Sequence, residues 1–388
     1  MTSSTKAAIL VFIDWFYPGY LAGGPVQSVL SLIQELHHDF EFWVFTTNRD
    51  LNGKVPYPNI ISNTWTKSQL GCNIYYADPS SLNRSLIIDV ISQCPAKVVY
   101  INSLFSRYFS VLPLHLIKHR FSDKTVLLAP RGMLGAGALS LKRHKKWVFL
   151  HYAKLSGLFR TVTWHATSSQ EEKEIRLRID KSAKCVIIPN LPKRLQPRTK
   201  SDKKTGELKL FFASRISRKK NLLFCLDILR TIRQGEIRFH IYGPVEDEAY
   251  WASCKELIVQ MPPRVQVAYK GTFSPEEAAN IHASEEVLFL PTLNENFGHA
   301  IVESLLCACP VIISDQTPWT DLQKAGAGFT IPLSDKEAFR RAVETFTSMG
   351  PDEFSAFSKK AFEYISTKID LDGTVTRYRN LFYELLKN

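Results

Sequence analysis

The chain has 388 residues, 45% of them hydrophobic and 22% charged, a balance typical of globular proteins with sizeable cores. The formal net charge is +12, and the segment from Lys124 to Gln170 holds eight Lys or Arg and no acidic residue, so an anionic partner is expected there. No apolar run approaches the about 20 residues of a membrane span, and the first run, 7–13, is too short for a secretory signal, so we expect neither.

Strand and helix patterns alternate through the first half of the chain. The apolar run 7–14 predicts a buried strand, and residues 25–36 predict a helix because apolar residues recur at helical spacing. Gly23 and Gly24 stand between them, where backbone amides can approach a ligand at a helix start; a tight turn is the alternative. Further apolar runs predict parallel strands covered on both faces, at residues 41–47, 97–102, 125–130, 162–167 and 185–190.

Three polar residues lie at or near the ends of these strands, namely Asn102, Arg131 and His165. Ligands of doubly wound sheets bind at the carboxyl ends of strands. Arg131 is therefore a candidate for binding an acceptor phosphate, and His165 is a second acceptor-binding candidate. For His165 the alternative is a hydrogen bond that satisfies the end of a strand.

Residues 142–158 predict a basic helix within the segment 142–160, where Lys and Arg mix with Trp147, Phe149, Tyr152 and Phe159. Such a helix can lie on an anionic bilayer, where each cation contributes about 1 kcal/mol. An ordinary helix with a solvated basic face is the alternative. The seven cysteines include no Cys-x-x-Cys pair and lie mostly in apolar runs, so we expect reduced thiols in a cytoplasm and no metal site.

The strand–helix alternation stops at a segment rich in Pro and Lys and then begins again. Residues 191–207 have linker composition. New strands are predicted at 208–214, 237–243, 265–271, 287–291, 310–314 and 328–332, and the end of the chain is predicted to be helical. The expected fold is therefore α/β, with two doubly wound, Rossmann-like domains facing a central cleft.

The turn after strand 208–214 carries four cations, Arg215, Arg218, Lys219 and Lys220. Cations at a helix start are unfavourable against the helix dipole, so a sequence that keeps four of them is expected to bind an anion there. An Arg guanidinium can donate hydrogen bonds to two phosphate oxygens at once, whereas a Lys ammonium acts as a point charge. We favour Arg215 and Lys220 as the pair that binds the anion; solvated surface charge is the alternative.

The stretch 291–315, PTLNENFGHAIVESLLCACPVIISD, places one acid before a helix and a second on it. Gly298 leaves room at the start of the helix, where the backbone of Phe297 to His299 can meet a phosphate or a sugar. Glu303 lies about 7 Å along the helix axis, a spacing that suits a ribose when a diphosphate sits at the helix start. Glu295 would then meet the sugar beyond the phosphates. A strand-to-helix turn with solvated acids is the alternative.

Together these motifs resemble glycosyltransferase family 4, the group 1 glycosyltransferases of GT-B fold. The resemblance rests on SRISRKKN, IYGPVED, the stretch 269–315 and the Gly-Gly loop, and it covers most of the chain. It implies retaining transfer of a sugar from a nucleotide diphosphate, here a UDP-sugar or a GDP-sugar, with no metal and no cofactor. The implied domains are an acceptor-binding domain (1–190), a linker (191–207), a donor-binding domain (208–370) and a final helix (371–388) that packs back near the first domain.

The resemblance also assigns roles to residues. It implies that Arg215 and Lys220 hold the diphosphate and act in catalysis with Glu295, that Glu303 takes the ribose, and that Phe297, Gly298 and His299 complete the sugar site. Gly23 and Gly24 would approach the phosphates from the first domain. Many relatives carry a His where this chain has Asn102, so Asn102 is the expected replacement in catalysis.

The segment APRGMLGAGALSLKRHKKWVF, 129–149, is typical of bacterial surface-polysaccharide members of this family. The expected acceptor is therefore lipid-linked or an oligosaccharide, in capsule, O-antigen or exopolysaccharide assembly. The expected location is the cytoplasm, with peripheral contact to the inner face of the plasma membrane. A sugar-nucleotide epimerase of GT-B fold and a basic nucleic-acid-binding protein are the alternatives; we favour a function without nucleic acid because the cations cluster on one segment.

Overall fold

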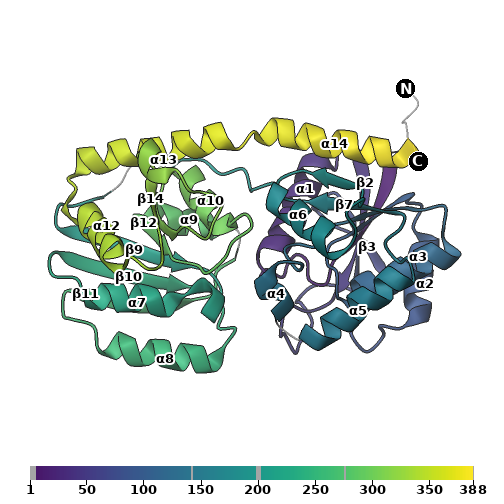
Figure 1. Cartoon of the computed structure of the whole chain (residues 1–388), viewed down its shortest axis with the longest axis horizontal. Helices are drawn as coiled ribbons and strands as arrows, with labels where there is room; N and C mark the ends of the chain where they lie inside the picture. Colours follow the sequence, from purple (N-terminus) through teal and green to yellow (C-terminus); the bar gives the residue numbers. More distant parts are fainter. Residues whose placement is uncertain (1–5, 141–142, 198–201, 275–276, 388) are drawn as a thin grey trace. The chain divides into compact units, whose positions relative to one another are not determined.

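A computed structural model describes residues 6–140, 143–197, 202–274 and 277–387. The chain divides into two compact units. Unit 1 comprises Met1–Leu191 and Leu371–Asn388, and unit 2 comprises Pro192–Asp370. Both are built from helices that cover a mainly parallel sheet (Figure 1), which confirms the predicted α/β class with two Rossmann-like units. The predicted linker includes residues 198–201, which lie outside the described residues.

The sheet of unit 1 has eight strands in the order β3-β4-β2-β1-β5-β6-β7-β8. All neighbours pair in parallel except β3 and β4. Val11 of β1 faces Val44 of β2 on one side and Tyr100 of β5 on the other. The strands are β1 (Ala7–Phe12), β2 (Phe40–Thr47), β3 (Trp65–Lys67), β4 (Asn73–Ala77), β5 (Val98–Ile101), β6 (Thr125–Leu128), β7 (Val162–Ala166) and β8 (Cys185–Ile187).

Helices cover both faces of this sheet, which is why β1 is a continuous apolar run. Ile9 and Val11 face one core, and Leu10 and Phe12 face the other. The first core contains residues of α1 and α14, and the second contains residues of α2, α3 and α6. The helices are α1 (Gly24–Leu36), α2 (Arg84–Gln93), η1 (Arg107–Val111), α3 (Leu112–Arg120), α4 (Ala136–Ser140), α5 (Arg143–Leu155), α6 (Ser169–Arg178) and α14 (Leu371–Lys387).

Helix α14 comes from the end of the chain and is part of the core of unit 1. Tyr378, Phe382 and Leu385 are buried. The ring of Phe382 lies 5.4 Å from that of Phe40 and 6.1 Å from that of Tyr100. Because each large apolar side chain contributes about 1.5–3 kcal/mol when buried, α14 adds substantially to the stability of unit 1.

The sheet of unit 2 has six parallel strands in the order β11-β10-β9-β12-β13-β14. Counted along the chain from β9, this is the order 3-2-1-4-5-6 of the Rossmann fold. The strands are β9 (Glu207–Ala213), β10 (Glu236–Tyr242), β11 (Val265–Gly271), β12 (Val287–Leu290), β13 (Val311–Ser314) and β14 (Gly328–Ile331). The helices are η2 (Arg218–Lys220), α7 (Leu222–Arg230), α8 (Glu248–Val259), α9 (Ala278–Ser284), α10 (His299–Leu306), α11 (Leu322–Ala325), α12 (Lys336–Ser348) and α13 (Pro351–Lys368).

Candidate functional site

The strand order of unit 2 singles out the carboxyl ends of β9 and β12. These strands are neighbours, but the chain continues from β9 toward β10 and β11 on one side, and from β12 toward β13 and β14 on the other. The loops that leave them therefore diverge, and ligands of such sheets bind at this switch point. Every residue of unit 2 that the sequence singled out follows β9 or β12.

Hydrogen bonds join the two loops at the switch point. Asn221 Nδ2 donates to the carbonyl of Pro291 at 3.0 Å. The backbone N–H of Leu293 and the Thr292 hydroxyl both donate to the carbonyl of Lys219, at 2.8 Å and 3.1 Å. These bonds fix the loop that carries the cations relative to the loop that follows β12.

The two cations favoured for the anion each have a carboxylate partner. Lys220 Nζ contacts Glu295 across the switch point, and their side chains are 12% and 13% exposed. Arg215 Nη1 lies 3.0 Å from Glu246 Oε2, in the loop after β10. Lys219 interacts electrostatically with all four of these residues, so they form one charged cluster. The sequence had not singled out Glu246.

The start of α10 offers backbone donors at the same edge of the sheet. Gly298 caps the helix with φ at 76°, the left-handed region that favours glycine, and a Cβ there would lie 2.9 Å from the Ile301 side chain. Phe297 is buried, and Trp319 Nε1 donates to its carbonyl at 2.7 Å. His299, the first helical residue, is half-buried. The first amides of a helix and its dipole together attract anions.

Glu303 lies on α10, one turn beyond His299. Its side chain is half-buried, and its carboxyl makes no hydrogen bond or salt bridge to any residue that the structure describes. Burial raises the pKa of Glu303 to about 7, an effect that the Lys193 ammonium partly offsets. A desolvated carboxyl of this kind is typical of a group that meets a ligand.

Asp14 occupies the corresponding switch point of unit 1, between β1 and β5, and it was not among the residues selected from the sequence. Ser106 Oγ, from the loop after β5, donates to Asp14 Oδ1 at 2.6 Å. Burial raises the pKa of the Asp14 carboxyl. The signal that would have found it is its position, since it is the first polar residue after the apolar run 7–13.

Arg131 and Asn102 form one hydrogen-bonded group in unit 1. Arg131 donates to Asn102 Oδ1 from Nε (3.2 Å) and Nη2 (2.7 Å), to Tyr100 Oη from Nη2 (2.9 Å) and to Asn190 Oδ1 from Nη1. These four bonds use four of the five N–H donors of the guanidinium. Asn102 is only 3% exposed, and its amide orients Arg131. Its expected part in catalysis stays a prediction.

The turn that carries Arg131 is strained. Arg131 has φ at 53°, and Gly132 follows with φ at 75°. A non-glycine residue in this region costs of order 1–3 kcal/mol and persists where its surroundings hold it. Here the buried Glu171 accepts from the N–H of Gly132 at 2.6 Å and from that of Thr167 at 2.7 Å, which ties the turn to the end of β7.

His165 is an internal residue of unit 1, so the prediction that it binds an acceptor does not hold. Its ring is fully buried. Nδ1 lies 2.8 Å from Tyr100 Oη, and Nε2 lies 2.8 Å from the Ile188 carbonyl and 3.1 Å from Tyr378 Oη. Burial lowers the pKa of His165 to about 3, so the ring is neutral near pH 7. The alternative, a hydrogen bond at a strand end, fits the structure.

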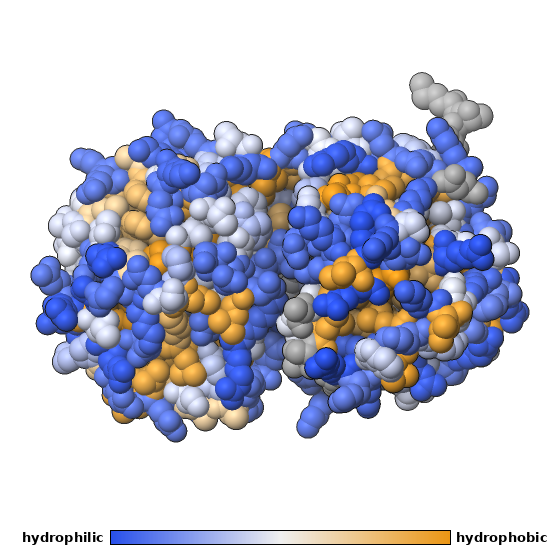
Figure 2. All heavy atoms as spheres, viewed as in Figure 1, coloured by the Kyte–Doolittle hydropathy of each residue, from blue (hydrophilic) through white to orange (hydrophobic). Residues whose placement is uncertain are grey.

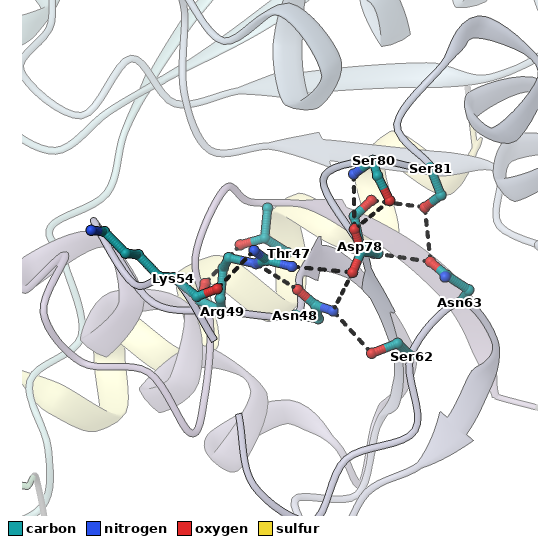
Figure 3. A network of polar contacts seen from close by, with 9 residues as sticks. All are labelled: Thr47, Asn48, Arg49, Lys54, Ser62, Asn63, Asp78, Ser80 and Ser81. Atoms are coloured by element: carbon teal, nitrogen blue, oxygen red, sulfur yellow. Dashed lines mark hydrogen bonds and ion pairs between the residues drawn. The ribbon is translucent and has the colours of Figure 1, made fainter. Parts of the chain in front are cut away.

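A second polar network joins the ends of β2 and β4 (Figure 3). The Asp78 carboxylate accepts from Ser80 (2.6 Å), Arg49 (3.1 Å) and Asn48 (3.2 Å). These bonds, the one from Ser80 foremost, lower the pKa of Asp78. Arg49 also donates to the Lys54 carbonyl at 3.1 Å. Asp78 and Arg49 both have hydrogen-bonding partners within the network. We therefore interpret the network as a structural link between the loops that follow β2 and β4.

Gly23 and Gly24 connect β1 to α1. Gly23 has φ at 74° and caps the helix, and a Cβ built on it would meet nothing within 4 Å. Glycine is therefore favoured here by backbone conformation, and the space beside it is open. The approach of this loop to phosphates stays a prediction.

Helix α5 exposes nine of its thirteen residues; Ala153 is buried, and Phe149 and Leu150 are half-buried against the core of unit 1. Figure 2 shows apolar and charged side chains intermingled on the face of unit 1 where Figure 1 places this helix. Four apolar or aromatic side chains of α5 are at least half exposed, namely Trp147, Val148, Tyr152 and Leu155. Three cations of the same helix are also exposed, namely Arg143, Lys145 and Lys154. Lys142, part of the predicted helix, lies outside the described residues.

Membrane spans and metal clusters are both absent from the described ranges. Within them, no helix has the length and apolar character needed to cross a membrane. The same ranges contain no cluster of three or more His, Cys, Asp or Glu side chains arranged to hold a metal ion. All seven cysteines are free, and all except Cys185 are buried.

Residues 194–363, nearly all of unit 2, match the family model described as "Glycosyl transferases group 1". No curated protein matches the chain in sequence.

Solved structures resemble the chain over nearly its whole length. Sucrose-phosphate synthase from Thermosynechococcus elongatus has a TM-score of 0.72 at 16% identity, covering 98% of this chain and 99% of that one. Anabaena HepE, in complex with UDP and glucose, has a TM-score of 0.73 at 15% identity, with coverage of 97% and 100%. WaaG, a glycosyltransferase involved in lipopolysaccharide biosynthesis, has a TM-score of 0.63 at 12% identity, with coverage of 97% and 99%. At these identities the likeness establishes the shared fold.

Proposed function

We propose that the protein is a glycosyltransferase that transfers a sugar from a UDP-sugar or a GDP-sugar to a lipid-linked or oligosaccharide acceptor; the group 1 match over residues 194–363 and the GT-B fold support this. The observation that carries the proposal is the cluster at the switch point of unit 2. There Arg215 and Lys220 lie beside a loop that leads into the start of α10. Cations and helix amides are the groups that recognise a diphosphate.

The proposed roles follow from the positions of the side chains. Arg215 and Lys220 bind the diphosphate and stabilise the negative charge that develops on it as the sugar leaves, the main electrostatic task of the reaction. Glu303 accepts from the ribose hydroxyls one helical turn beyond the phosphates. Glu295 and the backbone of 297–299 contact the donor sugar.

We also propose that transfer proceeds with retention and needs no metal ion or cofactor. Retention is what the resemblance to family 4 implies. Metal independence is supported by the cations, which supply the positive charge that a leaving diphosphate requires. A sugar-nucleotide epimerase would share the donor site, and detection of a new glycosidic bond on an acceptor decides between the two.

The acceptor is proposed to bind to unit 1, and the setting is proposed to be surface-polysaccharide assembly at the inner face of the plasma membrane. The exposed cations and aromatic rings of α5 complement an anionic lipid surface. Arg131 stays the candidate for an acceptor phosphate, with one N–H donor left over from its internal bonds. That WaaG serves lipopolysaccharide biosynthesis agrees with this setting.

Calorimetry with UDP and GDP tests the donor site. We expect Arg215→Ala, Lys220→Ala and Glu303→Ala each to weaken binding of the preferred nucleotide about 10- to 100-fold, because each removes a charge-assisted hydrogen bond worth about 1.5–3 kcal/mol. Lys255→Ala, which removes an exposed cation of α8 in the same unit, should bind as the wild type does. Unchanged affinity in all three site variants, with the fold intact, would remove the assignment.

A further inference from the structure

The cations of the donor site are already neutralised in the ligand-free chain. We call Arg215, Lys220 and the start of α10 the diphosphate cradle. Lys220 contacts Glu295, and Arg215 lies 3.0 Å from Glu246. Cations crowded at a helix start were expected to meet an anion, and in the structure the chain itself supplies anions.

These ion pairs use the groups that a diphosphate needs. A Lys ammonium has three N–H donors and an Arg guanidinium has five. In each ion pair, the donors that face the carboxylate are already used. The Lys220–Glu295 pair is the more shielded, at 12% and 13% exposure, whereas the side chains of Arg215 and Glu246 are 32% and 38% exposed. A phosphate oxygen cannot share Lys220 with Glu295 at close range without strong repulsion between the two anions.

We propose that Glu246 and Glu295 are internal counter-ions, and that a nucleoside diphosphate binds by displacing them from Arg215 and Lys220. The proposal rests on the donor site described above and adds Glu246 to it as a residue that sets affinity. No covalent bond changes in this exchange; one oxyanion replaces another at each cation.

The two carboxylates have different partners available once they are released. Glu295 lies on the loop proposed to bind the donor sugar, so a complete nucleotide sugar offers it new hydroxyl partners. A nucleoside diphosphate without a sugar offers no such hydroxyls. Once the sugar has been transferred, the Glu295 carboxylate therefore pairs with Lys220 again. The exchange therefore favours binding of the sugar-bearing donor and release of the product. Glu246, which follows β10, acts as a competitor for Arg215.

Isothermal titration with inorganic pyrophosphate, UDP and GDP tests the exchange on the full-length protein. Glu295→Gln and Glu246→Gln keep the side-chain shape and remove the negative charge. We expect Glu295→Gln to raise affinity for pyrophosphate and for the preferred nucleotide about tenfold, since the pair is shielded. We expect Glu246→Gln to raise it about two- to fivefold, because its pair is more exposed and an exposed pair is worth less.

Glu207→Gln is the matched control. Glu207 is a carboxylate of the same unit at the opposite end of β9, near Lys204 and Arg238 at 3.9 Å and 3.8 Å. The Glu207→Gln substitution changes the net charge as much as the two site substitutions do, but residue 207 lies away from the cradle. The control variant should therefore bind pyrophosphate and nucleotides with wild-type affinity. Thermal unfolding of each variant checks that the fold is retained, and the two site variants lie on separate loops.

The outcomes separate the exchange from the proposed function. Tighter binding in both site variants and not in the control supports the exchange. Equal or weaker binding in the site variants, when the wild type binds pyrophosphate or a nucleotide, overturns the exchange and leaves the donor site standing. An equal gain in all three variants is a general charge effect and also overturns it. Absence of wild-type binding to every probe removes the donor site and the exchange together.

Discussion

Burial of the Glu303 carboxyl lowers the stability of the folded protein when the group is charged, a cost that fits its proposed role in binding. The carboxyl lies half-buried on α10 without a hydrogen-bonding partner among the described residues, and its pKa is raised to about 7 by burial. In the unfolded chain the same group has an ordinary pKa. Above pH 7 the folded protein therefore holds a charged group in a site that disfavours charge, which is a cost that function explains.

Glu303→Gln should accordingly stabilise the ligand-free protein at pH 8. Because the folded pKa is raised, folding is penalised progressively as pH rises from about 4.5 to about 7, and the penalty is constant above that. We expect a gain of about 1–3 kcal/mol at pH 8, seen as a rise of several degrees in Tm, and a much smaller gain at pH 5.

Thermal unfolding of wild type and variant at both pH values measures this difference. Glu256→Gln, at an exposed position of α8, should change Tm little at either pH. A destabilised Glu303→Gln at pH 8, or a gain of the same size at pH 5, would contradict the proposed state of Glu303.

For single residues, the sequence predicted which charged side chains come together better than it predicted which side chains are buried. Arg215, Lys220 and Glu295 were selected because they follow apolar strands, and the structure brings them together. Glu246 also follows a strand, but its importance depends on β10 lying beside β9, which no local pattern reveals. For His165 the hydrogen-bonding alternative fits the structure, but its partner Tyr378 could not be foreseen because it lies 213 residues further along the chain.

Among the elements, α5 is the one whose surface calls for a partner. A helix of a globular protein normally buries an apolar stripe. In α5 this stripe is narrow: Ala153 is buried and Phe149 and Leu150 are half-buried against the core, whereas Trp147, Tyr152 and Leu155 are exposed. Lys146 is turned inward, where it donates to the Ala138 carbonyl at 2.6 Å. The exposed rings and the remaining cations fit the proposed contact with an anionic bilayer.

Replacing Arg143, Lys145 and Lys154 of α5 by Gln should weaken binding to anionic vesicles at least tenfold, since each cation contributes about 1 kcal/mol near such a surface. Sedimentation with vesicles of phosphatidylglycerol and phosphatidylcholine measures the bound fraction. A control with Lys255, Lys359 and Lys360 replaced by Gln changes the net charge equally on unit 2. Equal sedimentation of the α5 variant and the wild type would remove the membrane role of this helix.

Apolar patterning predicted most strands of both sheets. The runs at 7–14, 41–47 and 208–214 each overlap a strand whose carboxyl half is buried. The sequence did not predict β3, β4 or α2. β3 has only three residues, none of them buried, so it carries no apolar run to recognise.

For the whole molecule, the repeat of strand–helix arrays predicted two Rossmann-like units, and the structure and its relatives agree. The strand orders then place the candidate residues of unit 2 at its switch point, which sequence could not do because strand order depends on long-range pairing. In unit 2 this gives a charged cluster, the proposed site of the diphosphate; the switch point of unit 1 holds Asp14 beside Ser106.

A crystal structure of the protein with UDP or GDP, whichever raises its Tm more, tests the central claim most directly. We expect the diphosphate within hydrogen-bonding distance of Arg215, Lys220 and the first amides of α10, with Glu303 bonded to the ribose hydroxyls. A nucleotide bound away from the ends of β9 and β12, or a Glu303 side chain turned into solvent, would contradict it.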